Sequence, residues 1–533
     1  MTQPRSRTWR AIGATTAGVA LVAAGTAAAQ AATTPPPVLS LVNAVGEASI
    51  ERYVWGPGEG ESSIYGDVGA YLIAGKDPFE LRVSRPSYAD KIVADRVVVK
   101  KGKKSNVRLL DGMVTDFTGL QDFTTFTMKN AAGATVYTGD STFCPSPYGS
   151  DRTRPDAPDS TPYPVGCGGN PFLIGNLWGI QAGFSAGIDL PPDIDLPDGT
   201  YTTTIAITEK YRSHLQIPAD KATATLKLTL TTSRYDDEDE ARKAAPAGAR
   251  ALAQAPAAAP DHAHATEGDP KKQVSAYSPD LRPPTRRPST VAAATVPKGP
   301  RPDLRSLPAW GISLDDGSSG DSSGAGVDGR QYIAFGATVW NGGTSPLVVD
   351  GFRRTGTELM DAYQYFYDAA GKQVGSTTAG TMEWDKREGN MHWHFTDFAQ
   401  YRLLSADKKV AVRSGKEAFC LVNTDAVDTL LPNAKLRPTN TDLSSSCGAN
   451  TSVAVREVLD VGHGDTYHQG LPGQSFDVTD LPNGTYYIEV LANPSNRLTE
   501  LSTTNNASLR QVILSGSGAD RKLPVPAVHG LDG

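Results

Sequence analysis

The chain reads Gln331-Tyr332-Ile333-Ala334-Phe335-Gly336-Ala337-Thr338-Val339-Trp340 and then Asn341-Gly342-Gly343, which is its clearest strand signal. β-Branched and aromatic residues fill the first part, and the turn residues that follow are typical of a hairpin connection. A second signal of this kind is Thr485–Leu491, preceded by Pro482-Asn483-Gly484. Hairpins are therefore predicted at both places.

Further short strands are predicted along the chain, and no long stretch shows the periodicity of an amphipathic helix. They cover Thr202–Thr208, Ala222–Thr231 and Asp361–Tyr367, the last of which ends in a turn at Ala370-Gly371-Lys372. Many short strands joined by Gly, Pro and Asn turns are typical of β-sandwiches. The predicted fold is all-β, with two β-sandwich-like domains joined by a disordered Ala/Pro-rich linker.

Composition shows where the 533 residues divide. A first β-rich domain, to which we assign no function, is predicted at residues 36–235. An acidic run and then Ala- and Pro-rich sequence make 236–300 a linker, because it has too few large apolar residues for a core. The second domain covers residues 301–516, and residues 517–533 form a tail.

Residues 1–31 have the layout of a secretory signal peptide. Three arginines in the first ten residues precede an apolar, Ala-rich segment, and Ala29-Gln30-Ala31 fits a small-x-small cleavage site. An uncleaved anchor is the competing interpretation, because the apolar segment is near the length of a membrane span. Cleavage is favoured, and the mature protein is expected to be extracellular with no membrane-spanning segment.

The four cysteines agree with an oxidising compartment, because they fall two and two into the halves of the chain. Intradomain disulfides are predicted between Cys144 and Cys167 and between Cys420 and Cys447. A cysteine-ligated metal lacks the C-x-x-C spacing it would need. A nucleophilic Cys420 is the other alternative, but a cysteine in an apolar run is more often buried and paired.

Two histidines stand at i and i+2 in the alternating run Gly389–Phe398. On a strand, His392 and His394 would point to the same side. Two neutral imidazoles on one face suit a borderline metal such as copper or zinc. The alternative is an exposed or packed histidine pair with no ligand.

Other motifs follow the histidines in a fixed order. Lys-x-x-Phe-Cys-Leu occurs at 416–421 and Asp-Thr-Tyr at 465–467, and the chain continues with Asn493-Pro494 and with Glu500 before Thr504-Asn505-Asn506. Over roughly residues 301–515, this order resembles the copper amine oxidases of the lysyl oxidase family. The resemblance implies an extracellular β-sandwich enzyme that oxidises primary amines or peptidyl lysine with molecular oxygen, giving aldehyde, ammonia and hydrogen peroxide.

Residue by residue, the resemblance implies that His392 and His394 bind copper. It also implies that Lys416 and Tyr467 are joined into lysine tyrosylquinone, a cofactor made from the protein itself. The family pattern is H-x-H-x-H, and Asn390 stands where the first histidine belongs. An amide is a poorer copper ligand than imidazole, so either copper binding is weak or another side chain completes the site.

Two pairs of residues near the motifs are further candidates. His463 and His468 flank Tyr467, and either could supply a third ligand. A general base is also required for amine oxidation, and Asp465 and Asp397 are candidates by nearness in sequence.

Charge and the aromatic residues bear on possible partners. A net charge of −7 and a pI near 5.7 argue against nucleic acid and are compatible with a cationic substrate. In the first domain, Trp55, Tyr65 and Trp178 could line a carbohydrate or peptide surface, although core packing is the default for scattered aromatics. The alternative function for the whole protein is a catalytically silent extracellular β-sandwich binding module.

Overall fold

The computed structural model describes residues 38–55, 62–100, 102–146, 149–235, 295–315, 329–368, 370–386, 391–413, 418–436, 445–471 and 473–531. The predicted signal peptide, the predicted linker up to residue 294, Asn390 and Lys416 lie outside these ranges. Within them the all-β class is confirmed, since the helical elements are α1 (Glu209–His214), η1 (Ala219–Lys221) and η2 (Gly518–Asp520). No described helix is long and apolar enough to cross a membrane.

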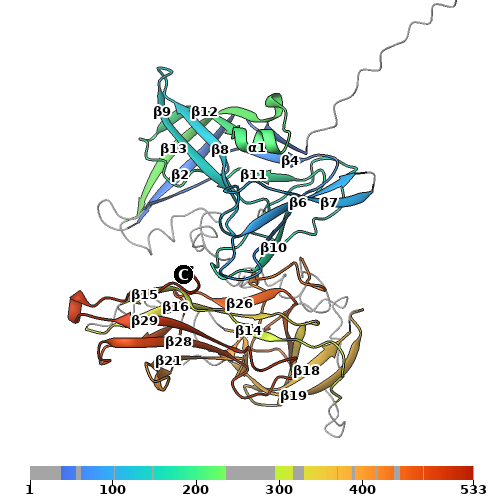
Figure 1. Ribbon diagram of the computed structural model, residues 1–533, viewed down its shortest axis with the longest axis vertical. Helices are drawn as coiled ribbons and strands as arrows, with labels where there is room; N and C mark the ends of the chain where they lie inside the picture. Colours follow the sequence, from blue (N-terminus) through green and yellow to red (C-terminus); the bar gives the residue numbers. More distant parts are fainter. Residues whose placement is uncertain are drawn as a thin grey trace, which may run out of the picture. The chain divides into compact units, whose positions relative to one another are not determined.

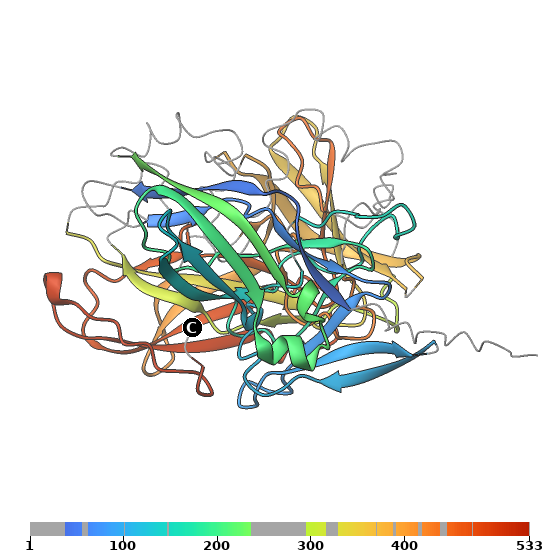
Figure 2. The same cartoon turned by 90° about the horizontal axis from the view of Figure 1, so that it is seen from above.

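The N-terminal half contains three sheets (Figure 1). The first has the order β1 (Leu39–Asn43), β4 (Ala70–Ala74), β11 (Ser185–Gly187). The second has the order β10 (Gly175–Ile180), β5 (Phe79–Ser84), β6 (Val93–Lys100), β7 (Lys103–Arg108). The third has the order β3 (Ser62–Tyr65), β2 (Glu47–Trp55), β13 (Thr223–Tyr235), β12 (Gly199–Ile207), β8 (Leu120–Lys129), β9 (Thr135–Phe143). The pairing of β2 with β13 is parallel and brings the blue start of this half beside its green end (Figures 1 and 2).

The C-terminal half contains three more sheets. The first has the order β14 (Leu304–Ser306), β16 (Tyr332–Asn341), β26 (His463–Tyr467), β24 (Asp425–Ala426), with β15 (Trp310–Asp315) and β27 (Ser475–Asp477) also paired to β16. The second has the order β23 (Ala418–Phe419), β20 (Trp393–Thr396), β19 (Gln373–Trp384), β18 (Leu359–Tyr367), β17 (Leu347–Arg353), β25 (Ala454–Leu459). The third has the order β22 (Val410–Arg413), β21 (Ala399–Ser405), β28 (Gly484–Ala492), β29 (Ala507–Leu514).

The five strands predicted from sequence are confirmed as β12, β13, β16, β18 and β28, but both predicted hairpins are wrong. β17, which follows β16, belongs to another sheet, and β27, which precedes β28, pairs with β16. Nine of the ten residues of β16 are buried, so this strand needs neighbours from several parts of the chain rather than one hairpin partner. The turn after β18 does form a hairpin, with β19.

No sheet of the described chain combines strands from both halves, yet the halves share apolar packing. The core of the N-terminal half includes four side chains from the other half: Leu307, Trp310, Trp340 and Val427. The second core draws only on residues from Leu304 to Leu514. Each sheet therefore lies within one half of the chain, while one core draws on both halves.

Polar contacts join the halves beside this shared core. The backbone N–H of Leu177 donates to Thr429 Oγ1 at 2.8 Å, and that hydroxyl donates to Asn176 Oδ1 at 3.0 Å. Asn170 Nδ2 donates to Thr338 Oγ1 at 3.0 Å. Asn170, Asn176, Thr338 and Thr429 are all buried, so these bonds form away from water, where an unpaired polar group is costly.

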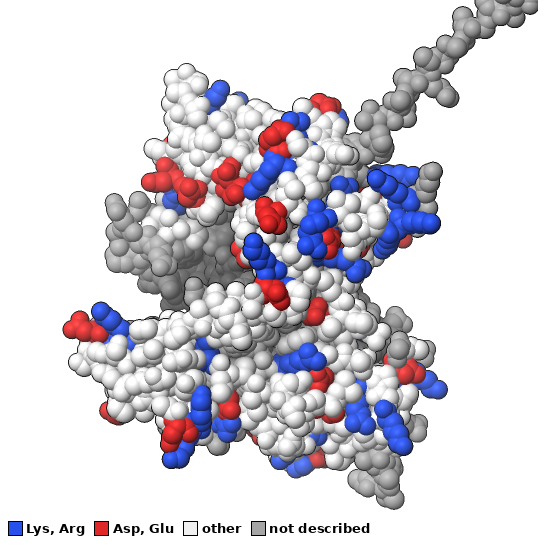
Figure 3. All heavy atoms as spheres, viewed as in Figure 1, with Lys and Arg blue, Asp and Glu red and all other residues white. Residues whose placement is uncertain are grey.

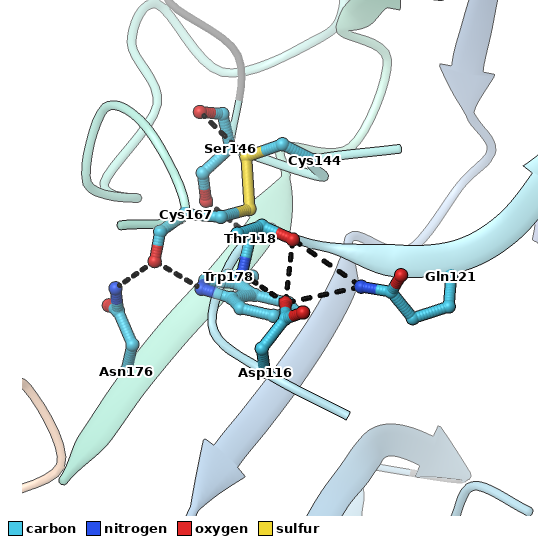
Figure 4. Close-up of a disulfide and its surroundings, with 9 residues drawn as sticks. Asp116, Thr118, Gln121, Cys144, Ser146, Cys167, Asn176 and Trp178 are labelled. Carbon is cyan, nitrogen blue, oxygen red and sulfur yellow. Dashed lines mark hydrogen bonds between the residues drawn. A yellow bond between two sulfur atoms is a disulfide. The ribbon is translucent and has the colours of Figure 1, made fainter. Parts of the chain in front are cut away.

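Both predicted disulfides are confirmed, as Cys144–Cys167 and Cys420–Cys447. Around the first, the carbonyl of Cys167 accepts hydrogen bonds from Asn176 Nδ2 at 2.9 Å and Trp178 Nε1 at 3.1 Å (Figure 4). Trp178 is fully buried, so it packs in the core rather than lining a ligand surface. Tyr65 packs edge-on against Tyr53, with ring centroids 5.7 Å apart.

Candidate metal and cofactor site

The two predicted copper ligands lie side by side at the start of β20. Their Nε2 atoms are 2.9 Å apart, and their ring centroids are 4.6 Å apart. His394 is 1% exposed, and His392 is half-buried. The i, i+2 spacing thus brings the two imidazoles to one place, with one nitrogen of each ring directed at the other.

A carboxylate stands behind this pair. Asp385 Oδ2 lies 3.4 Å from Nδ1 of His394, and both side chains are almost wholly buried. The backbone N–H of Asp385 also donates to the carbonyl of His392 at 3.0 Å. A carboxylate on the far nitrogen fixes the tautomer of a metal-binding histidine and raises its basicity, so Nε2 is the nitrogen of His394 that would bind a metal.

Asp385 was not predicted from the sequence as a residue of this site. The β19–β20 hairpin, in which Glu383 stands opposite His394, brings it there. A predicted antiparallel pairing between the segment that ends at Trp384 and the segment with the two histidines would have indicated the contact between Asp385 and His394.

The spacing of the two nitrogens fits a metal ion. Two imidazole nitrogens 2.9 Å apart are close enough to bind one ion, and imidazole is a ligand that suits copper. Among the described residues no group of three His, Cys, Asp or Glu side chains is arranged to hold a metal.

The alternative third ligands therefore do not join the pair. His463 is buried and bonded through Nε2 to the carbonyl of Lys435, and Nδ1 of His468 accepts the N–H of Gly470 at 3.2 Å. Asn390, which directly precedes Met391 and His392, lies outside the described residues.

The segment after Lys416 pairs with the histidine strand. β23 runs antiparallel to β20, with Phe395 opposite Phe419. Lys416 itself lies outside the described residues, two positions before β23 begins. The predicted copper ligands and the predicted cofactor lysine thus belong to neighbouring strands of one sheet or to the segments that enter them.

The second disulfide connects the segment after Lys416 to the histidine strand. Cys420 directly follows β23, and its partner Cys447 accepts the backbone N–H of Trp393 at 2.9 Å. The indole Nε1 of Trp393 donates to Ala449 at 3.0 Å. Cys420–Cys447 therefore links β23 to the segment around Cys447, and this segment bonds to Trp393, the residue between the two histidines.

Tyr467, the predicted partner of Lys416, ends β26 and lies against β23. Its hydroxyl donates to the carbonyl of Cys420 at 3.4 Å, and its ring centroid is 5.0 Å from that of Phe419. Burial, and then the charge of Asp465, raise the pKa of Tyr467 well above its usual value, so the phenol is neutral.

Two buried carboxyls accompany the tyrosine. Glu457 Oε2 accepts the N–H of Leu421 at 3.0 Å, and burial together with nearby Asp465 raises the pKa of Glu457 well above its usual value. Of the two candidate bases, Asp465 lies in this buried region, whereas Asp397 pairs with Arg497 on the outside at 3.5 Å. Glu457 was not found from sequence, because it lies in no motif.

The histidines and Tyr467 are on opposite faces of β20. Trp393 and Phe395 belong to the core cluster that contains Phe419 and Tyr467. His394 stands between them on the strand, so its side chain points to the other side. The motifs thus lie around the paired strands β20 and β23, but the ring of Tyr467 does not lie beside the imidazoles.

Comparisons with known proteins agree with the motif order. The family described as lysyl oxidase matches residues 362–520. The chain is 29% identical over 130 residues to Lysyl oxidase homolog 3B of Danio rerio, covering 24% of this chain and 14% of that protein. It is 30% identical over 125 residues to Protein-lysine 6-oxidase of Homo sapiens, covering 23% of this chain and 26% of that protein. To Protein-lysine 6-oxidase of Sus scrofa it is 28% identical over 138 residues, covering 26% of this chain and 49% of that protein. The chain thus spans less than half of the length of each of these relatives.

Proposed function

Because the C-terminal region of this chain belongs to the lysyl oxidase family, we propose that the protein is a secreted, copper-dependent amine oxidase. It would convert a primary amine, oxygen and water into an aldehyde, ammonia and hydrogen peroxide. Its substrates would be peptidyl lysine or small primary amines. The observation that carries the proposal is the convergence of the histidine pair, the end of the lysine segment and Tyr467 on strands β20, β23 and β26.

His392 and His394 would hold the copper ion through their Nε2 atoms. Asp385 would orient His394 by accepting from its Nδ1. Copper supplies redox chemistry with oxygen, by which a tyrosine ring becomes oxidised. Asn390 would contribute little to copper binding, because an amide is a poor ligand for this metal.

Lys416 and Tyr467 would form lysine tyrosylquinone, the electrophilic carbonyl group that amine oxidation requires. The Cys420 carbonyl holds the Tyr467 hydroxyl, and Asp465 and Glu457 stand close enough to influence its ionisation. A buried phenol that stays neutral is inert until oxidised. Asp465 is the carboxylate we propose as proton acceptor near the ring.

The test is a search for the cross-link. Protein produced with copper should give one peptide that joins Lys416 to Tyr467, absorb as a quinone and react with phenylhydrazine. Tyr467→Phe should abolish all three signals. Tyr486→Phe is the matched control, because Tyr486 is also buried and its hydroxyl also donates to a backbone carbonyl, that of Pro482 at 2.7 Å. Separate recovery of both peptides from copper-loaded protein would contradict the proposal.

A catalytically silent binding module is the second candidate function. Its support is the position of Tyr467 in the core, on the opposite face of β20 from the histidines. Such a module would show no phenylhydrazine adduct and no amine-dependent peroxide, even with copper bound. The same preparation therefore separates the two functions.

A further inference from the structure

The β6–β7 hairpin concentrates positive charge on an otherwise acidic protein. Residues 93–108 contain six Lys or Arg and one Asp, a net charge of +5, so the rest of the chain carries −12 within a total of −7. Lys and Arg atoms gather at the end of this hairpin in Figure 3, where Figure 1 labels β6 and β7. This hairpin lies in the N-terminal half, in a different sheet from the strands of the proposed copper site.

The arrangement of the charges works against folding stability. Lys100 stands directly opposite Lys103 across the hairpin, and Lys104 stands opposite Val99. Like charges on directly opposed strand residues are destabilising. Every residue of β7 is exposed, so this strand adds nothing to the core that would offset the repulsion.

The lysines are not neutralised by neighbours. Arg108, at the base of β7, forms an ion pair with Asp95 at 2.6 Å. Within the described parts of the chain, no ion pair involves Lys100, Lys103 or Lys104. A charged edge strand protects a sheet from aggregation, but one lysine on the edge suffices for that, and two opposed lysines add only repulsion.

We propose that the tip of the β6–β7 hairpin binds inorganic polyphosphate, a linear polymer of phosphoanhydride units that carries no bases. Clustered ammonium groups bind phosphates through charge and release of counterions. Recognition of single-stranded nucleic acid also uses aromatic stacking, and residues 93–108 contain no aromatic side chain. Insertion into a membrane needs apolar side chains, and the tip reads Lys100-Lys101-Gly102-Lys103-Lys104.

The test is titration of the full-length protein with inorganic polyphosphate at several salt concentrations. Changing Lys100, Lys103 and Lys104 together to Gln removes three phosphate contacts, so the slope of log K against log salt should fall by about 2. At 0.1 M salt this corresponds to about a hundredfold weaker binding. The same three positions changed to Arg should keep the affinity, since the charge is retained.

The matched control changes Lys210, Lys221 and Lys227 to Gln. These lysines lie in the same half and each faces an acidic partner, Asp122, Asp220 and Glu47 respectively. The control alters the net charge equally and should leave binding within about twofold of the original.

Three results would overturn the proposal. The first is an equal loss in the hairpin and control variants, because it would mean that overall charge alone governs binding. The second is tighter binding to oligothymidylate of equal charge than to polyphosphate, which would point to base contacts. The third is binding to vesicles of anionic lipid without binding to polyphosphate.

Discussion

At the residue scale, the carboxylate behind His394 is the most informative contact of the proposed copper site. Asp385→Asn keeps the shape but weakens the acceptor for His394 Nδ1, so copper affinity should fall about 10- to 100-fold. Isothermal titration with copper measures this loss. Asp361→Asn is the control, because Asp361 pairs with Arg354 on the surface of the same half. Equal affinities of the two variants would mean that Asp385 does not support the metal.

Asn390 is the second residue on which the site depends. It has the same strand parity as His392 and His394, so Asn390→His should add an imidazole on the metal side and tighten copper binding. His392→Ala and His394→Ala should each abolish binding, because too few ligands remain. His463→Ala and His468→Ala should leave it unchanged. Unchanged binding in Asn390→His, together with loss in either of the last two variants, would place the third ligand beside Tyr467.

At the scale of elements, the two disulfides allow a matched comparison. They close loops with sequence separations of 23 and 27, so the loss of either by Cys→Ser substitution should cost about 3.5 kcal/mol in the chain-entropy model. Only the Cys420–Cys447 pair touches the histidine strand, through Trp393. Chemical denaturation should therefore show similar destabilisation, while copper affinity falls only in the variant without Cys420–Cys447. If both variants lost copper affinity equally, Cys420–Cys447 would have no specific role in the copper site.

Glu457 links strand β25 to the segment after β23 and makes stability depend on pH. Folding raises its pKa above the ordinary value of 4.5, mainly through burial. Its contribution to stability is thus fully present below about pH 4.5 and is lost as the pH rises through the folded value.

Glu457→Gln keeps an acceptor for the Leu421 N–H and removes this titration. The variant should gain stability relative to the original protein at pH 8 more than at pH 4.5, as measured by urea unfolding. Glu358→Gln, at an exposed residue paired with Lys386, should show no such difference. A constant gap between the Glu457 variant and the original protein at both pH values would contradict the raised pKa.

At the scale of the whole molecule, the shared core predicts that the halves stay together when the chain is cut. Cleavage at a specific protease site placed between residues 240 and 290 would cut the backbone that connects the two halves. Because Leu307, Trp310, Trp340 and Val427 pack in the core of the N-terminal half, the two fragments should co-elute in size-exclusion chromatography. Fragments that elute apart would support independent domains joined only by a linker.

The sequence determined the all-β class, five of the strands, the disulfide pairing and the motif order, because these follow from local composition and spacing. Alternation and turn residues identified β12, β13, β16, β18 and β28, and the two-and-two split of cysteines gave both pairings. The i, i+2 spacing was sufficient to bring His392 and His394 together, since strand side chains repeat every two residues.

Tertiary structure decided what depends on contacts between distant segments. β16 takes its neighbours from β14, β15, β26 and β27 because almost its entire surface is buried, which no turn signal reveals. Asp385 and Glu457 reach the site through sheet register and burial rather than through a motif. The same holds for the separation of Tyr467 from the histidines, because the faces of β20 acquire different surroundings only when the sheets pack.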